Sequence, residues 1–428
     1  MVFWNRRNGR SRSNLQAIGG ASNSTPNESG DNPQGLPSFQ EAVGTTARAV
    51  RSDPVRARMR VAFTPSQPVS DVRMFAGRQE VLSLIIRAIE DQRLHVVLFG
   101  DRGIGKTSTL HVLAKLADQA GYIVHYTSCG ESSTFDEIFR AALSEVPLLY
   151  HSDFDPAASS PDGVDTLAAV LPQNSLTVAD VTRVMGKMTS LRLLIILDEF
   201  DRCEFSQFRK SVAELIKNLS DRSLPVQIVI GGVAANLSEL LGYLPSIRRN
   251  ILGLPLPSMT YEELSQIISI GSAVSGLPYD EDAVAAIAKC ANGSPYLGSL
   301  LGHHAGIAAL DRSRSSVTGS DVNTALDLAS KEMELRIAPD SLRLIRNITE
   351  PKLRLALEKL AREALTTIGQ VELVGSSTGI AQETLTSLER AGIIHRIDGH
   401  GDGIYRFSDQ SAPMLIWLQS LQRWNDPS

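Results

Sequence analysis

The chain has 428 residues, with 42 lysines and arginines against 47 acidic residues, and 43% of its residues are hydrophobic. This size and balance predict a globular protein with two or three domains. No apolar run approaches the roughly 20 residues that cross a bilayer, so we exclude a membrane-spanning protein. Three widely separated cysteines, without a CxxC or paired-histidine spacing, argue against a disulfide scaffold or a zinc site. A reducing cytoplasm fits this cysteine usage best.

The basic charge is concentrated at the N-terminus. Residues 1–60 contain nine arginines, no lysine and four acidic residues, although the whole chain has a net charge of -5. This segment is rich in Ser, Asn, Gly and Pro and lacks helical or strand periodicity, so we expect residues 1–62 to form a disordered basic tail. A solvated leader and a weak contact with nucleic acid or an acidic surface are both compatible with this composition.

From Phe75 onward, helical and strand patterns alternate, which predicts an α/β core over residues 63–255 with a parallel sheet. An amphipathic helix is expected at residues 79–91. The expected strands span residues 95–99, 122–127, 191–197, 226–230 and 250–254. A polar, proline-containing stretch at residues 150–173 predicts a loop at the rim of the sheet.

After residue 255 the strand patterns stop and helical patterns follow. Thr260 and Glu263 have the spacing of a capping box, and we assign residues 256–336 to a helical domain. Residues 337–428 form the last predicted domain. Its expected elements are helices at 341–349, 352–365 and 381–391 and a hairpin of strands at 393–398 and 403–407. This order of elements predicts a winged helix-turn-helix.

A glycine-rich motif follows the first expected strand and precedes a helix. Residues 100–107, GDRGIGKT, match the pattern GxxxxGK[ST]. Glycine backbone can curve around phosphate with its N–H groups inward, and a helix N-terminus adds partial positive charge. We therefore expect ATP to bind here, with Lys106 on its β- and γ-phosphates and the Thr107 hydroxyl on Mg²⁺. The expected phosphate-binding residues are Gly100, Asp101, Arg102, Gly103, Ile104, Gly105, Lys106, Thr107 and Ser108.

An acidic cluster follows the third expected strand. A carboxylate at the tip of a neighbouring parallel strand is placed to hold Mg²⁺, usually through water, so Asp198 is the expected second metal-binding residue. Glu199 is placed to polarise an attacking water as a general base. For Asp201 and Arg202 we favour a local ion pair.

With these two motifs the sequence resembles the AAA+ ATPases, in particular the bacterial and archaeal branch related to origin-recognition initiators, over about residues 72–420. The resemblance implies ATP hydrolysis by an α/β core followed by a helical lid and a C-terminal winged helix. Phe75-Ala76-Gly77-Arg78 resembles the family's short motif near the adenine, which implies nucleotide contacts for Gly77 and Arg78.

The resemblance also implies a polar sensor after the fourth strand and an arginine finger before the fifth. Asn236 fits the sensor position, although it could equally cap the helix that follows. Arg248 and Arg249 fit the finger, which acts only across the interface of an oligomer, although they could equally form a solvated helix end.

One position departs from the family pattern. Many AAA+ lids carry an arginine in a Gly-x-Pro-Arg sequence, whereas residues 293–296 here read GSPY. Tyr296 cannot supply that positive charge. Turnover is therefore expected to be slow or to depend on a partner.

The C-terminal domain has little positive charge for a DNA-binding module. Residues 338–428 contain ten lysines and arginines against eleven acidic residues, and Arg390 is the only basic residue in the expected recognition helix. Because DNA affinity depends largely on phosphate neutralisation, protein contact or packing is favoured over direct DNA binding.

We therefore predict an ATPase that hydrolyses MgATP to rearrange its core and lid and acts on a protein or DNA partner, as a homo-oligomer or with another protein. Two alternatives remain open. One is a nucleotide-gated scaffold or signalling switch with little turnover, and the other is a helper ATPase in DNA transposition, replication or defence.

Overall fold

The computed structural model describes residues 54–154, 165–203, 206–234, 236–242, 245–365, 373–374, 379–397 and 404–425. The predicted basic tail up to residue 53 lies outside these ranges. So does the predicted turn of the C-terminal hairpin, residues 399–402, together with the adjoining residues 398 and 403.

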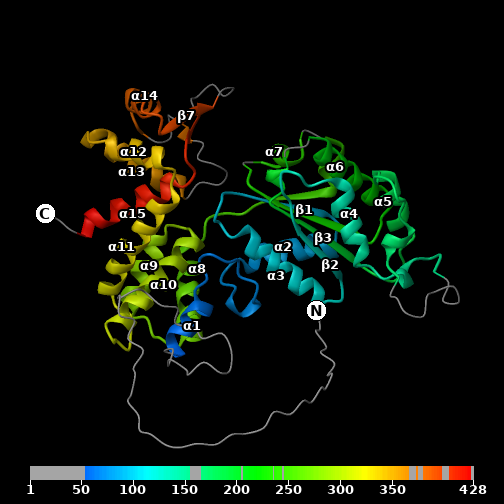
Figure 1. Ribbon diagram of the computed structural model, residues 1–428, viewed down its shortest axis with the longest axis horizontal. Helices are drawn as coiled ribbons and strands as arrows, with labels where there is room; N and C mark the ends of the chain where they lie inside the picture. Colours follow the sequence, from blue (N-terminus) through cyan, green and yellow to red (C-terminus); the bar gives the residue numbers. More distant parts are fainter. Residues whose placement is uncertain are drawn as a thin grey trace, which may run out of the picture. The chain divides into compact units, whose positions relative to one another are not determined.

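A five-stranded parallel sheet forms the centre of the α/β core (Figure 1). Its strands are β1 (His95–Phe99), β2 (Ile123–Ser128), β3 (Leu193–Asp198), β4 (Val226–Gly232) and β5 (Ile251–Pro255). They lie in the order β2-β3-β4-β1-β5, and every neighbouring pair is parallel. The three central strands consist entirely of buried residues, as expected for strands covered on both faces. The predicted α/β class and parallel sheet are therefore confirmed.

Helices cover both faces of this sheet. Helices α2 (Gln79–Glu90) and α3 (Lys106–Gln119) pack on one face. Helices α4 (Phe135–Ser144), α5 (Val178–Met185) and α6 (Ser206–Asp221) pack on the other. Successive side chains of β1 point to opposite faces of the sheet. Val96 and Leu98 pack in the core under α2 and α3, whereas Val97 packs in the core under α4, α5 and α6.

Short helices lie in the connections between these strands and helices. They are the 3-10 helices η1 (Val72–Met74), η2 (Leu148–Tyr150), η3 (Leu167–Val170), η4 (Phe200–Arg202) and η5 (Pro245–Asn250), and the helix α7 (Leu237–Leu241). The predicted rim loop at 150–173 contains η3, while its residues 155–164 lie outside the described ranges.

A helical region follows the sheet, as predicted. It comprises α8 (Tyr261–Ser275), α9 (Glu281–Ala291), α10 (Pro295–Asp311) and α11 (Gly319–Arg336). The capping box predicted at Thr260 and Glu263 is present, with each side chain bonded to the other residue's backbone N–H. Pro295 occupies the first turn of α10.

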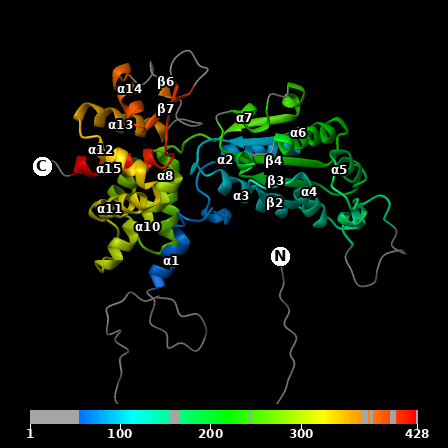
Figure 2. The ribbon, with the colours of Figure 1, turned by 45° about the horizontal axis from the view of Figure 1, so that its top comes forward.

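An additional helix, α1 (Pro54–Ala62), packs beside α8 and α10 and is drawn in blue in Figures 1 and 2. Residues 54–62 were expected to belong to the disordered tail, and that part of the prediction is wrong. Met59 and Phe63 are almost completely buried in the helical region, at 0% and 1% exposure. The ring of Phe63 occupies the space that a Cβ on Gly271 would need. The apolar residues of α1 and the adjoining Phe63 thus form part of the hydrophobic core of the helical region. The arginines around them made this apolar face hard to see in the sequence.

The last region combines helices with a small antiparallel sheet (Figure 2). Its helices are α12 (Pro339–Asn347), α13 (Pro351–Ala364), α14 (Gln382–Arg390) and α15 (Ala412–Asn425), and its strands are β6 (Leu373–Val374), β7 (Ile394–Ile397) and β8 (Ile404–Phe407). These helices together with the strand order β6-β8-β7 have the arrangement of a winged helix, which confirms the predicted fold. Among the described residues, no helix combines the length and apolar character needed to cross a membrane.

Candidate functional site

The glycine-rich loop between β1 and α3 curls around its own lysine. Gly105 caps the N-terminus of α3 with φ 99°, in the left-handed region that favours glycine. The Nζ atom of Lys106 donates hydrogen bonds to the carbonyl oxygens of Gly100 at 2.9 Å and Asp101 at 2.6 Å. The ammonium group is therefore held inside the loop.

Burial controls the protonation of this lysine. Removal from water lowers the pKa of Lys106 to about 8, and the nearby carboxylates of Asp201, Asp101 and Asp198 partly oppose that shift. The side chain still carries its charge at neutral pH. It is a buried cation that an anionic ligand would stabilise.

Asp198 ends β3 with only 1% of its surface exposed. Its Oδ1 accepts the backbone N–H of Glu199 at 2.8 Å, and its Oδ2 accepts the hydroxyl of Tyr126 at 2.6 Å. Burial, together with the hydrogen bond to Asp198, raises the pKa of Tyr126, so the phenol keeps its proton at neutral pH. Both carboxylate oxygens are thus oriented by donors of the same chain.

The glycine-rich loop and the acidic cluster meet at the carboxyl edge of the sheet. Gly231 of β4 lies between β1 and β3, where an added Cβ would be 2.9 Å from Asp198 Oδ1 and 2.5 Å from Leu110 Cδ1 of α3. On the other side of β3, the rings of His111 and Tyr126 make an edge contact with centroids 4.5 Å apart. Helix α3, which begins at the glycine-rich loop, therefore lies close to Asp198.

The turn after Asp198 contains a different ion pair from the one expected. Glu199 has φ 52° and its Oε2 lies 2.9 Å from Arg202 Nη1. Asp201 instead accepts the backbone N–H of Val233 at 2.7 Å, just after β4. The predicted pair of Asp201 with Arg202 is wrong, because the backbone after β4 takes the Asp201 carboxylate and leaves Arg202 to Glu199.

Residues 74–230, which include both motifs, match a family model described as the AAA ATPase domain. This chain contains an AAA ATPase domain. A search of curated proteins finds no match.

Several solved structures are similar to most of this chain. RuvB of Thermotoga maritima, a Holliday junction branch migration motor, has a TM-score of 0.40 and 18% identity over 79% of this chain and 94% of that chain. Cdc6p of Pyrobaculum aerophilum has a TM-score of 0.44 and 16% identity over 86% and 98% of the two chains. Orc1 of Aeropyrum pernix, solved in complex with DNA, has a TM-score of 0.42 and 15% identity over 86% and 97%.

Within the AAA ATPase domain, Arg78 lies beside the glycine-rich loop. Burial lowers the pKa of the Arg78 side chain, and the negative charge of Glu263 partly opposes this shift. The Nη2 atom of Arg78 donates a hydrogen bond to the carbonyl oxygen of Ile104 at 3.4 Å. The backbone N–H groups of Gly77 and Arg78 donate to Gln266 Oε1 at 3.2 Å and Glu263 Oε1 at 2.9 Å. The motif before α2 therefore contacts both the loop and helix α8.

The proposed sensor and finger lie beyond the part of the chain that matches the AAA ATPase domain. Asn236 caps α7, where its Oδ1 accepts the N–H of Glu239 at 3.1 Å. Arg249 forms an ion pair with Asp221, with 3.6 Å between Nη2 and Oδ1, and 77% of the arginine side chain is exposed. The sensor and finger roles of these two residues stay predictions.

The first turn of α10 approaches the glycine-rich loop of the AAA ATPase domain. A Cβ on Gly103 would lie 3.9 Å from Tyr296 Cβ. The Tyr296 hydroxyl accepts a hydrogen bond of 2.6 Å from Arg336, whose guanidinium also lies 5.8 Å from the tyrosine ring centroid. Arg336 was not predicted as part of this site, because it stands 40 residues away from Tyr296 in the sequence.

Proposed function

We propose that the protein binds MgATP, hydrolyses it, and uses the reaction to rearrange its core and helical lid against a protein or DNA partner. The observation that carries this proposal is that Leu110 of α3 and Asp198 both lie within 3 Å of the position that a Cβ on Gly231 would take. This contact supports a single site built from the loop before α3 and the acidic turn after β3.

The groups present fit a magnesium nucleotide. Lys106 is a buried cation that has only carbonyl oxygens as hydrogen-bond acceptors, and phosphate oxygens can replace them. Thr107 and Asp198 offer hydroxyl and carboxylate oxygens, the donor type that Mg²⁺ prefers. Mg²⁺, when bound, would neutralise charge on the β- and γ-phosphates. The proposed phosphate contacts come from residues 100–108, with Gly77 and Arg78 toward the rest of the nucleotide.

The chain's own residues then have separate roles in hydrolysis. Lys106 would hold the transferring phosphate, and Glu199 would accept a proton from the attacking water. In the structure Glu199 Oε2 is in an ion pair with Arg202, so release of this pair would free both carboxylate oxygens for the water. Asn236 would orient the water, and Arg249 would reach the phosphate of a neighbouring subunit.

Phosphate release by the purified full chain tests this proposal. Lys106→Ala is expected to lose ATP binding, whereas Glu199→Gln is expected to bind ATP and fail to release phosphate. Lys115→Ala on the exposed side of α3 and Glu214→Gln on the exposed side of α6 are matched controls. Equal release by the wild type, Lys106→Ala and Glu199→Gln overturns the assignment.

A nucleotide-gated switch with little turnover is the second candidate. Two features favour it. The ion pair with Arg202 engages the carboxylate of Glu199, the proposed general base. Tyr296 stands where many AAA+ lids carry an arginine, and it brings no positive charge to the phosphates. Nucleotide retained through purification, with slow single-turnover kinetics, would support this candidate over a cycling ATPase.

A helper ATPase acting on DNA remains the third candidate. Gel retardation of duplex DNA at several salt concentrations addresses it, because phosphate contacts give a steep salt dependence. Separate deletions of residues 1–53 and 338–428 would identify the segment that binds. No retardation at low salt would leave a protein partner.

A further inference from the structure

Strand β2 contributes a side chain to the acidic cluster that no motif predicted. The hydroxyl of Tyr126 donates to Asp198 Oδ2 at 2.6 Å, while the N–H of Glu199 donates to Oδ1 at 2.8 Å. A carboxylate oxygen has two acceptor positions, so each oxygen of Asp198 keeps one for a further partner. The two donors fix the rotation of the carboxylate without using up its acceptors.

The position of Tyr126 is itself fixed by the fold. In the parallel ladder, Tyr126 pairs with Ile196 and Ser128 pairs with Asp198, so the tyrosine lies two residues before the acidic residue on the adjacent strand. Side chains two residues apart share one face of a sheet. The imidazole of His111 on α3 makes an edge contact with the Tyr126 ring, with centroids 4.5 Å apart. The phenol is thus held between the strand and α3.

We propose that Tyr126 is a positioning residue, whose hydroxyl orients the carboxylate of Asp198 in advance for the magnesium of the bound nucleotide. This inference rests on the proposed function. Orienting a ligand group before binding removes an ordering cost from the binding step. A hydrogen bond to a charged acceptor is also among the stronger ones in proteins, so its loss is measurable.

The variant Tyr126→Phe removes the hydroxyl and keeps the ring. Tyr122→Phe is the matched control, because the Tyr122 hydroxyl accepts from Arg192 at 3.0 Å just before the same strand. The affinity of the full chain for ATP is measured by calorimetry in EDTA and at a series of Mg²⁺ concentrations, with thermal unfolding as a check on folding. Tyr126→Phe is expected to leave metal-free ATP affinity unchanged and to raise the half-saturating Mg²⁺ concentration about fivefold to tenfold.

A double-mutant cycle isolates the contact. In an Asp198→Asn background, Tyr126→Phe is expected to have no further effect on the Mg²⁺ dependence. The inference is overturned if Tyr126→Phe and Tyr122→Phe show the same Mg²⁺ dependence as the wild type, while the wild type binds MgATP normally. The inference is also overturned if Tyr126→Phe loses ATP affinity equally with and without Mg²⁺ and unfolds at a lower temperature than the wild type. That result would assign Tyr126 a structural role. Absence of ATP binding by the wild type is a different result, because it defeats the proposed function itself.

Discussion

Glu263 Oε1 accepts the backbone N–H of Arg78 at 2.9 Å, and its Oε2 accepts the N–H of Thr260 at 2.9 Å. One carboxylate therefore closes the capping box of α8 and also holds the loop that lies beside the glycine-rich motif. Gly77 allows this approach, since a Cβ there would lie 2.7 Å from Glu263 Oε1. This contact gives a physical route by which nucleotide at the loop would influence helix α8.

Replacement of Glu263 by alanine is expected to lower both stability and nucleotide response. The variant leaves two backbone donors without their acceptor, which costs about 1–3 kcal/mol where the donor is removed from water. Urea unfolding with and without ATP measures the two effects, because a ligand that binds the folded state stabilises it. Glu263→Gln keeps one acceptor oxygen and should be intermediate. The exposed Glu281 in the first turn of α9 provides a control, Glu281→Ala, and identical midpoints for it and Glu263→Ala would contradict the expectation.

Removal of Arg202 is expected to increase phosphate release. The guanidinium holds the Glu199 carboxylate at 2.9 Å, and both side chains are about half exposed. Exposed ion pairs are worth about 0–1 kcal/mol, so freeing Glu199 should accelerate turnover by no more than about fivefold. Single-turnover measurements on Arg202→Ala test this, with Arg202→Ala/Glu199→Gln as the inactive control. A slower rate in Arg202→Ala would assign the arginine to the reaction itself.

The sheet could be predicted because its central strands are short, continuous apolar runs followed by polar turns. Residues 193–197 are such a run, and their position in the chain also located Asp198 at the carboxyl edge. A strand that is buried on both faces appears in the sequence as a continuous apolar run, so it can be recognised without knowing which strands lie beside it. The glycine-rich loop between β1 and α3 was predictable for the same local reason.

Contacts between distant segments could not be predicted in this way. Tyr126 bonds to Asp198 across 72 residues, and nothing near Tyr126 in the sequence indicates the register of β2 on β3. Arg202 could pair with either of two nearby carboxylates, and the backbone after β4 decides between them. Helix α1 was missed because its arginines hide the spacing of Met59 and Ala62, which matters only beside the helical region.

Nucleotide binding is expected to take up a proton above pH 8. Burial lowers the pKa of Lys106 to about 8 from the ordinary 10.5, and bound phosphate favours the charged form. Because the unfolded chain binds more protons between pH 8 and 10.5, this group makes the nucleotide-free protein more stable as pH rises through that window. ATP affinity should fall over the same window. Calorimetry in two buffers of different ionisation enthalpy measures the uptake, and Lys115→Ala should leave it unchanged.

Helix α1 should contribute directly to the stability of the helical region. Met59 is fully buried, whereas Val61 on the same helix is 63% exposed. Truncation of a buried methionine usually costs about 2–5 kcal/mol, while Val61→Ala should change the free energy of unfolding by less than about 0.5 kcal/mol. Denaturant unfolding of Met59→Ala and Val61→Ala makes the comparison. Equal midpoints for the two variants would show that α1 does not stabilise the fold.

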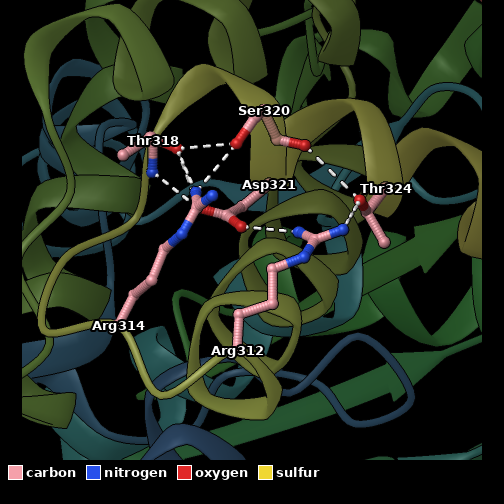
Figure 3. Close-up of polar contacts among 6 residues, drawn as sticks. All are labelled: Arg312, Arg314, Thr318, Ser320, Asp321 and Thr324. Atoms are coloured by element: carbon pink, nitrogen blue, oxygen red, sulfur yellow. Dashed lines mark hydrogen bonds and ion pairs between the residues drawn. The ribbon is translucent and has the colours of Figure 1, made fainter.

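A buried carboxylate fastens α11 to the end of α10 (Figure 3). Asp321 is completely buried and accepts from Arg312 at 2.7 Å and Arg314 at 3.0 Å, while it also completes a capping box with Thr318. Burial alone raises the pKa of Asp321, but the hydrogen bonds from Thr318 and Arg312 and the charge of Arg314 lower it overall. The charged form is therefore the one that the fold stabilises.

Acid should weaken this cluster. A carboxyl group whose folded pKa lies below its unfolded value contributes stability above the unfolded value, near 3.8 here, and loses it as the pH falls through the folded value. Asp321→Asn leaves two guanidinium groups without their counter-ion and is expected to cost about 2–4 kcal/mol at pH 7. The difference between the wild type and Asp321→Asn should shrink below pH 4, because protonation removes the same charge. Asp327→Asn is the control on α11, and a constant difference for Asp321→Asn from pH 7 to pH 2.5, measured by urea unfolding, would contradict the electrostatic explanation.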